Sequence, residues 1–129
     1  MKYKELTGTI ISCAYKVHRI LGFGFLESVY QNALVYELER AGLNVQKEHR
    51  IRVRYEGVVV GDFIADIVVE DRVILELKSV QEIHPIHEAQ LNNYLHATGM
   101  EVGLLLNFGH ELETRRKVNT TRRQDVQRH

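Results

Sequence analysis

The sequence predicts an α/β domain in which a mixed β-sheet packs against helices, in the order α-α-β-β-β-α-β. Two amphipathic helical patterns come first, and three strand patterns follow in direct succession over residues 45–79. A further helical pattern then precedes VGLLLNF, a short and mainly apolar strand at 102–108, and LETRRKV at 112–118 is expected as one last short strand. Because a helix joins the third and fourth strands, these two should pair in parallel through a right-handed crossover.

The first two elements are predicted as helices from the spacing of their apolar residues. Such residues recur at intervals of three and four over 6–21, and Gly22 interrupts the pattern. The second helix, over about 26–40, is followed by Gly42, the residue type that commonly ends a helix. Cys13 lies on the apolar stripe of the first helix, so we interpret it as a small core residue and not as a nucleophile.

Three strands are predicted next, joined by two short turns. Residues 45–55 alternate in character and end at the turn Glu56-Gly57, and 58–69 and 73–79 form the second and third strands. Glu70-Asp71-Arg72 is then a three-residue hairpin loop. This loop length sets the pairing between the second and third strands.

The pairing places charged residues together inside otherwise apolar strands. Asp66 faces Glu76, and Lys78 points to the same side because it lies two residues further on. Directly opposed residues have Cβ atoms about 5 Å apart, so like charges there repel. A divalent cation such as Mg²⁺ would neutralise the two acids. The alternative is an ordinary pair of charges, in which Asp66 pairs with Lys78 or an arginine and Glu76 faces solvent.

The third helix carries a polar stripe. Pro85 suits its first turn and Gly99 its end, and His87, Gln90 and Tyr94 lie along one side. These side chains are either a solvated flank with a half-buried tyrosine or neutral donors for phosphate oxygens.

Three further residues have both a structural and a functional interpretation. Glu27 begins the second helix, where an acid favours the helix dipole, and Tyr30 lies one turn on along the same side. His84 joins His87 in suggesting zinc, but the chain lacks the partners of an H-E-x-x-H helix and has one cysteine. We therefore do not assign a zinc site.

Composition indicates one domain, over 1–114, followed by a basic C-terminal tail at 115–129. The chain has 129 residues and a formal net charge of zero, so no global charge favours a polyanionic partner. The tail holds six arginines and lysines against Asp125 alone. Arg50, Arg52 and Arg54 form a second basic row, which is either a solvated strand face or a guide for a phosphate backbone.

The compartment predicted is the cytoplasm. A single cysteine allows no internal disulfide, and no apolar run is long enough for a membrane helix or a signal peptide.

Three motifs resemble those of a known group of enzymes. Asp66, nine residues and then Glu76-Leu77-Lys78 resemble the signature of the PD-(D/E)xK nuclease superfamily, although Ala65 stands where many members have proline. QLNNY at 90–94 matches the Q-x-x-x-Y motif of its RecB-like exonuclease branch. GFLESVY at 24–30 has the G-x-x-E-x-x-Y pattern that names a family of small prokaryotic proteins in the superfamily.

The resemblance implies a restriction-endonuclease-like core and a metal-dependent nuclease that hydrolyses phosphodiester bonds of nucleic acid, with DNA favoured. Asp66, Glu76 and the backbone carbonyl of Leu77 would bind Mg²⁺ or Mn²⁺, and Lys78 would orient the attacking water or stabilise charge on the phosphate. Glu27 would supply a further carboxylate.

The same resemblance gives supporting roles and leaves alternatives. Gln90, Tyr94 and Tyr30 would steady the metal site or contact the nucleic acid. One alternative is a binding or assembly module that keeps the fold without turnover. Another is an enzyme acting on a small phosphate-bearing molecule, which no phosphate-binding glycine loop supports. A homodimer or a partner protein is compatible with the small size and neutral charge.

Overall fold

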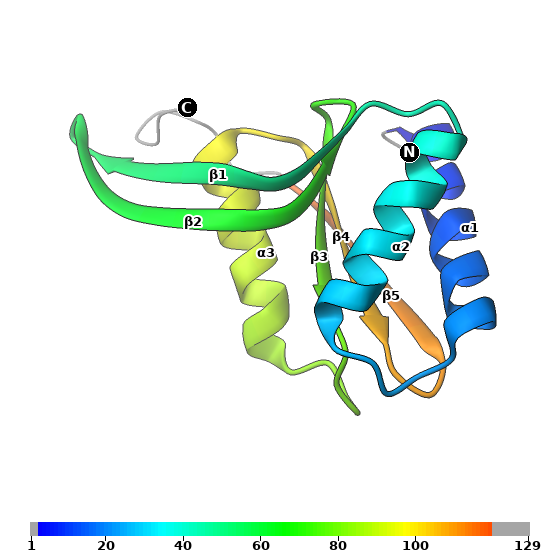
Figure 1. Ribbon diagram of the computed structural model, residues 1–129. Helices are drawn as coiled ribbons and strands as arrows, with labels where there is room; N and C mark the ends of the chain where they lie inside the picture. The colour runs from blue at the N-terminus through cyan, green and yellow to red at the C-terminus, as the bar shows by residue number, and fades with distance from the viewer. Residues whose placement is uncertain (1–2, 120–129) are drawn as a thin grey trace.

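The computed structural model describes residues 3–119, which form a five-stranded sheet with helices packed on both faces (Figure 1). The strands lie in the order β1-β2-β3-β4-β5, with β3 and β4 parallel and every other neighbouring pair antiparallel. This confirms the predicted class, the element order and the parallel crossover. The elements are α1 Lys4–Leu21, α2 Glu27–Arg40, β1 Val45–Tyr55, β2 Val58–Val69, β3 Val73–Lys78, α3 Pro85–Thr98, β4 Val102–Phe108 and β5 Leu112–Val118.

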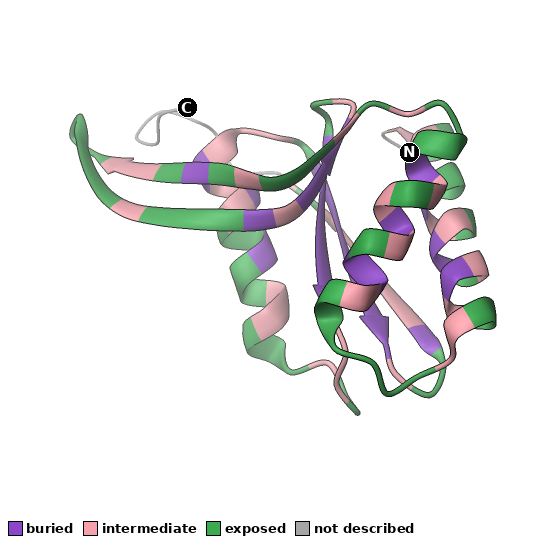
Figure 2. Cartoon of the chain, in the orientation of Figure 1, coloured by how far each residue is buried: buried purple, intermediate pink, exposed green. Residues whose placement is uncertain are grey.

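Two hydrophobic layers hold the sheet between the helices. On one face α1 and α2 pack against the sheet, with Leu34 and Leu38 in the same cluster as Leu75. On the other face Leu91 of α3 packs with Ile74 and its neighbours. Strands β3 and β4 are buried almost throughout, as parallel strands covered on both faces are (Figure 2). Each fully buried leucine contributes roughly 2 kcal/mol to folding.

A glycine allows α3 to lie close to the sheet. A Cβ added to Gly103 of β4 would come within 2.7 Å of the Cδ1 atom of Leu91, a distance that real Cβ atoms do not reach. Because α3 rests on this point, the absence of a side chain at Gly103 sets the height of the helix above the strands.

The predicted three-residue loop between β2 and β3 is confirmed. Val69 pairs with Val73 and Ile67 with Leu75, while Glu70 and Asp71 adopt left-handed conformations with φ of 56° and 52°. The regular pairing stops at Ile67, one residue before Asp66 would meet its partner.

Beyond that point the β1–β2 hairpin bends away from the sheet and extends past α3 (Figure 1). Here β2 pairs with β1 alone, and most of the outer half is exposed (Figure 2). The exposed apolar side chains are Tyr55, Val58, Val59, Val60, Phe63 and Ile64. The bend opens a fork between β2 and β3, and the candidate site lies in that fork.

The remaining predictions concern the ends of the domain and Cys13. Strand β5 continues to Val118, so residues 115–118 of the predicted tail belong to the sheet, while 120–129 lie outside the described residues. Cys13 is half-buried and packs against the core, as predicted. Among the described residues, no helix is long and apolar enough to cross a membrane.

Candidate functional site

Asp66 lies at a break in the sheet, where it is unpaired toward both neighbouring strands. Toward β1, the pairs on either side are Lys47 with Ile67 and His49 with Ala65, and Glu48 between them has φ of 57°. Toward β3, the Asp66 and Glu76 carboxylates accept backbone N–H groups in place of regular backbone pairing. The Leu77 N–H donates to Oδ2 of Asp66 at 2.8 Å, and the Asp66 N–H donates to Oε1 of Glu76 at 3.4 Å.

This arrangement holds both carboxylates close together and leaves one oxygen of each carboxylate available to bind a ligand. Asp66 and Glu76 each use one oxygen on the backbone of the opposite strand. The second oxygen of each accepts no hydrogen bond from the described residues. Asp66 and Glu76 are therefore brought together, as the register predicted, but across a gap and not across a continuous ladder.

Burial makes ionisation of this pair unfavourable. Glu76 is only 8% exposed, and its pKa is raised to about 8, first by burial and then by the Asp66 carboxylate. The pKa of Asp66 is also raised by burial, partly offset by its bond from Leu77. At neutral pH the metal-free pair holds a proton, mostly on Glu76. Acids crowded and desolvated in this way are a common feature of functional sites.

Lys78 is the cation nearest in sequence to these acids, at the end of β3. It lowers the pKa of both Asp66 and Glu76, but less than burial raises them. Its ammonium makes no hydrogen bond or ion pair with the residues that the structure describes. Lys78 is therefore close enough to act on the pair without being joined to it.

Helix α3 brings one of its predicted residues to the pair. Tyr94 is half-buried, and its pKa is raised by burial and then by Glu76 and Asp66, which places it on the side of the acids. Its ring centroid lies 5.5 Å from that of Phe63 in β2. Gln90, one turn earlier, is exposed.

Glu27 is near the acids but does not join them. It is the exposed first residue of α2 and caps no backbone N–H with its side chain. Its charge raises the pKa of both Asp66 and Glu76. However, within residues 3–119 no three His, Cys, Asp or Glu side chains gather closely enough to hold a metal ion. A contribution from Glu27 would require a bridging water or a movement of its side chain.

Tyr30 is fully buried, so of its two predicted roles only the supporting one is compatible with the structure. Its ring stacks on Phe108 with centroids 4.5 Å apart. Its hydroxyl donates to the Gly22 carbonyl at 2.7 Å and accepts from the Phe25 N–H at 3.3 Å. Tyr30 therefore fixes the glycine-rich segment that leads into Glu27.

Two site residues were missed by the sequence reasoning. Gln31 is buried on α2 and its amide donates to the backbone carbonyl of Asp66 at 3.0 Å, which anchors the break in β2. A polar residue beside Tyr30 was the only signal for it. The negative charge of Glu48 raises the pKa of Asp66. The alternating pattern of residues 45–55 did not indicate that Glu48 lies near Asp66.

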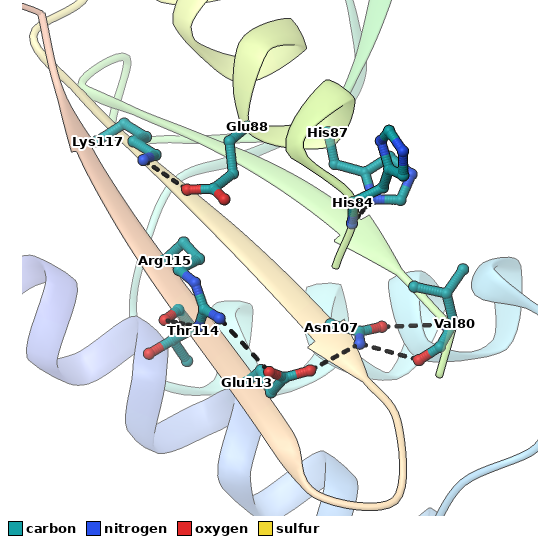
Figure 3. Close-up of polar contacts among 9 residues, drawn as sticks. All are labelled: Val80, His84, His87, Glu88, Asn107, Glu113, Thr114, Arg115 and Lys117. Atoms are coloured by element: carbon teal, nitrogen blue, oxygen red, sulfur yellow. Dashed lines mark hydrogen bonds and ion pairs between the residues drawn. The ribbon is translucent and has the colours of Figure 1, made fainter. Parts of the chain in front are cut away.

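His84 and His87 cap the N-terminus of α3 (Figure 3). The His87 Nδ1 accepts the His84 N–H, and the His84 Nδ1 accepts the Ile86 N–H, both at 3.1 Å. Each Nδ1 atom therefore accepts a backbone N–H at the start of the helix.

The donor set in the fork suits a hard divalent cation. Two carboxylates with one oxygen each available match the one or two carboxylates that Mg²⁺ takes while keeping its waters. The raised pKa of Glu76 shows that the described residues leave the pair under-neutralised. The residues present therefore fit such an ion.

Comparison with known structures finds the same fold in other proteins. The crystal structure of SSO0001 is 22% identical, with a TM-score of 0.58 over 94% of this chain and 59% of that chain. An alkaline exonuclease from Laribacter hongkongensis, LHK-Exo, is 12% identical, with a TM-score of 0.54 over 92% of this chain and 72% of that one. The chain thus spans less than two thirds of SSO0001. At these identities the likeness concerns the fold.

Comparison of sequences identifies the family. No curated protein matches the chain. The model of the PD-(D/E)XK nuclease superfamily matches residues 4–120, which is nearly the whole sequence, and the mixed sheet has the expected restriction-endonuclease-like form. The chain belongs to the PD-(D/E)XK nuclease superfamily.

Proposed function

We propose that the protein is a metal-dependent nuclease that hydrolyses phosphodiester bonds of DNA, with Mg²⁺ or Mn²⁺ held by Asp66, Glu76 and the Leu77 carbonyl. The observation that carries this proposal is the pair of acids, Glu76 buried and Asp66 half-buried, whose ionisation is unfavourable without a cation, beside a lysine that is not bonded to either. A bound ion would polarise the scissile phosphate and lower the pKa of a water.

The residues of the chain have distinct roles in this proposal. Glu76 would bind the ion as a carboxylate, because the positive charge of the ion would offset the burial that raises the pKa of Glu76. Lys78 donates to the attacking water or to a phosphate oxygen where negative charge develops. Gln31 keeps the Asp66 backbone in position through its bond to the carbonyl.

The outer residues assist substrate binding. Glu27 acts through water as a further carboxylate, and Gln90 and Tyr94 offer neutral donors to the phosphate backbone along α3. Tyr30, in the core, holds the segment before Glu27 in place through the bond from its hydroxyl to the Gly22 carbonyl.

Within the superfamily we assign the chain to the GxxExxY family and the RecB-like branch. Both motifs frame the fork: Gly24–Tyr30 leads into α2, and Gln90 and Tyr94 lie on α3. We further propose that the catalytic unit runs to the end of β5 at Val118, beyond the boundary at 114 that composition indicated, and that the protein acts in the cytoplasm.

Three alanine variants test the proposal, assayed on single- and double-stranded DNA and RNA with Mg²⁺ and Mn²⁺. Lys78→Ala should lose cleavage by about a hundred- to a thousandfold yet keep the rise in melting temperature that metal produces, because a protonated lysine does not bind the ion. Asp66→Ala and Glu76→Ala should lose both. Lys16→Ala, which removes an ammonium that pairs with Glu37 between α1 and α2, is the matched control and should behave as wild type.

The rival function is a non-catalytic module that binds nucleic acid or assembles with a partner. The zero net charge of the chain is compatible with it. Wild-type protein that cleaves no nucleic acid with either metal, together with a Lys78→Ala variant that changes only the melting temperature, would establish this module and reject the nuclease.

A further inference from the structure

A small cavity opens at the ends of β3 and β4, directly beyond Lys78. It has a volume of about 160 Å³, and the residues that form its walls include Phe23, Ser79, Val80, Gln81, Phe108 and His110. The carboxyl ends of parallel strands are where α/β sheets commonly bind ligands. None of these residues has a part in the proposed chemistry, so the cavity needs a separate explanation.

The cavity adjoins the candidate site on two sides. Ser79, Val80 and Gln81 follow Lys78 without interruption. The Ser79 hydroxyl donates to the Phe25 carbonyl at 2.8 Å, which ties this wall to the segment leading into Glu27. A group seated in the cavity would therefore be attached to a phosphate close to Lys78.

The wall formed by Val80 is rigid. The buried Asn107 side chain accepts the Val80 N–H at 3.0 Å and donates to the Val80 carbonyl at 2.9 Å, and it also donates to Glu113 at 3.2 Å (Figure 3). A Cβ on Gly109 would lie 3.0 Å from the Val80 oxygen, so the two segments touch. The cavity is thus built into the structure before any ligand arrives.

Aromatic rings form the other walls. Phe23 is 56% exposed, and its ring centroid lies 3.8 Å from that of the His110 imidazole. Phe108 is buried behind them, fixed by its stacking on Tyr30. An exposed phenylalanine at a cavity mouth contributes little to folding, but it presents a flat face on which a nucleobase can stack, whatever the base.

The size of the cavity restricts its occupant. An enclosed cavity of about 150 Å³ is known to hold one benzene molecule, so about 160 Å³ with an open mouth suits the ring system of a single nucleobase. A base still paired within a duplex has no access to an opening of this size. The exposed amide of Gln81 at the rim can hydrogen-bond the edge of such a ring.

We propose that this cavity receives one unpaired nucleobase, belonging to a nucleotide next to the bond that is cut. The inference rests on the proposed nuclease function and narrows its substrate to single strands or to frayed and splayed ends. Phe23 is the stacking residue, and the clamp between Asn107 and Val80 keeps the pocket open.

Fluorescence anisotropy of short labelled single strands tests the proposal, with the inactive Lys78→Ala protein as background and Mg²⁺ present. Adding Phe23→Ala should weaken binding about five- to 150-fold, the range for loss of one base stack, while Phe23→Tyr should retain it. Tyr36→Ala, which removes an equally exposed ring on α2, is the matched control and should have no effect. Strands made wholly of abasic nucleotides should bind both proteins equally weakly.

A second readout is the fluorescence of a single-stranded DNA with 2-aminopurine placed at each position in turn. One position should be quenched by the Phe23 protein and not by Phe23→Ala. Equal affinity of the two proteins for normal strands, or no quenching at any position, would overturn the cavity assignment.

These outcomes separate the cavity from the nuclease. Base-dependent binding by a wild-type protein that never cleaves would reject the nuclease and keep the pocket. Cleavage that is equally fast on abasic strands and in Phe23→Ala would keep the nuclease and reject the pocket.

Discussion

Two glutamates of the chain occupy opposite electrostatic environments, in the β2–β3 fork and on the outer surface between α3 and β5. Glu88 of α3 accepts from the Lys117 ammonium of β5 at 2.6 Å (Figure 3), and this bond is the main reason that its pKa is lowered. Glu76 is buried without a bonded cation, and its pKa is raised to about 8.

The difference separates a structural charge from a functional one. The pair of Glu88 and Lys117 is a neutral surface unit of the kind that contributes little to stability in either direction. Glu76 lowers the stability of the fold whenever it is ionised, since burial penalises its charge. A chain that keeps such an acid keeps it for a purpose other than folding, and the fork is therefore where chemistry is expected.

The largest effect should come from removing charge in the fork. Asp66→Asn and Glu76→Gln keep the shape of each side chain and should lower metal-dependent cleavage by about a thousandfold or more, because several kcal/mol of transition-state stabilisation are lost. The comparison variant Glu88→Gln should stay within about twofold of wild type. Comparable losses at Glu76 and Glu88 would end the distinction between the two regions.

The next effect concerns stability as a function of pH. The folded pKa of Glu76, about 8, lies above its ordinary value of 4.5, so between these values the folded state holds the proton that the unfolded state has released. The free energy of unfolding should therefore fall as pH rises from about 5 to about 8. At about 1.4 kcal/mol per pKa unit, the loss is on the order of a few kcal/mol.

Glu76→Gln should remove this slope. Urea denaturation without metal should find the variant more stable than wild type at pH 9, with the difference shrinking toward pH 5. A variant that is less stable than wild type at pH 9 would mean that the charge at position 76 is already neutralised in the fold.

A smaller effect is expected from replacing the arginine row on β1. Like the pair of Glu88 and Lys117, this row includes a surface ion pair. Arg50 pairs with Asp62 at 3.1 Å, and Arg52 lies opposite the same aspartate in the strand register. Because Arg50 is already paired and Arg52 lies opposite the same carboxylate, replacing Arg50, Arg52 and Arg54 by glutamine should change DNA affinity by less than about threefold. A large fall in affinity with a shallower salt dependence would instead assign the row to the substrate.

The smallest effect is the loss of the surface pair itself. The pKa of Glu88 is lowered, so its contribution is present above its ordinary pKa and disappears as pH falls through the lowered value. Glu88→Gln should cost less than about 0.5 kcal/mol at pH 7, and nothing at strongly acid pH. Thermal melts at the two pH values measure this.

The order of the elements and the loop register were predictable because both depend on local pattern. The three-residue loop after Val69 sufficed to bring Asp66 and Glu76 together, since a strand has a period of two. The proximity of Lys78 follows from the same rule.

The break at Asp66 was not predictable in this way. It depends on the hairpin leaving the sheet, on Glu48 in a left-handed conformation opposite, and on Gln31 reaching the Asp66 carbonyl from α2. None of these three features produces a periodic pattern in the sequence. Tyr30 likewise shares a helix side with Glu27, yet packing on Phe108 turned it into a buried support.

The glycine beneath α3 has a consequence for how the protein tolerates variation. A Cβ at Gly103 would lie 2.7 Å from Cδ1 of Leu91, so either the Leu91 side chain or the helix that carries Tyr94 must shift. Because packed interiors transmit strain, a single methyl group at this position of β4 would displace Tyr94 relative to the acids of the fork. A random mutational screen would thus score Gly103→Ala among the inactivating changes, although its methyl group lies in the core and never meets the substrate.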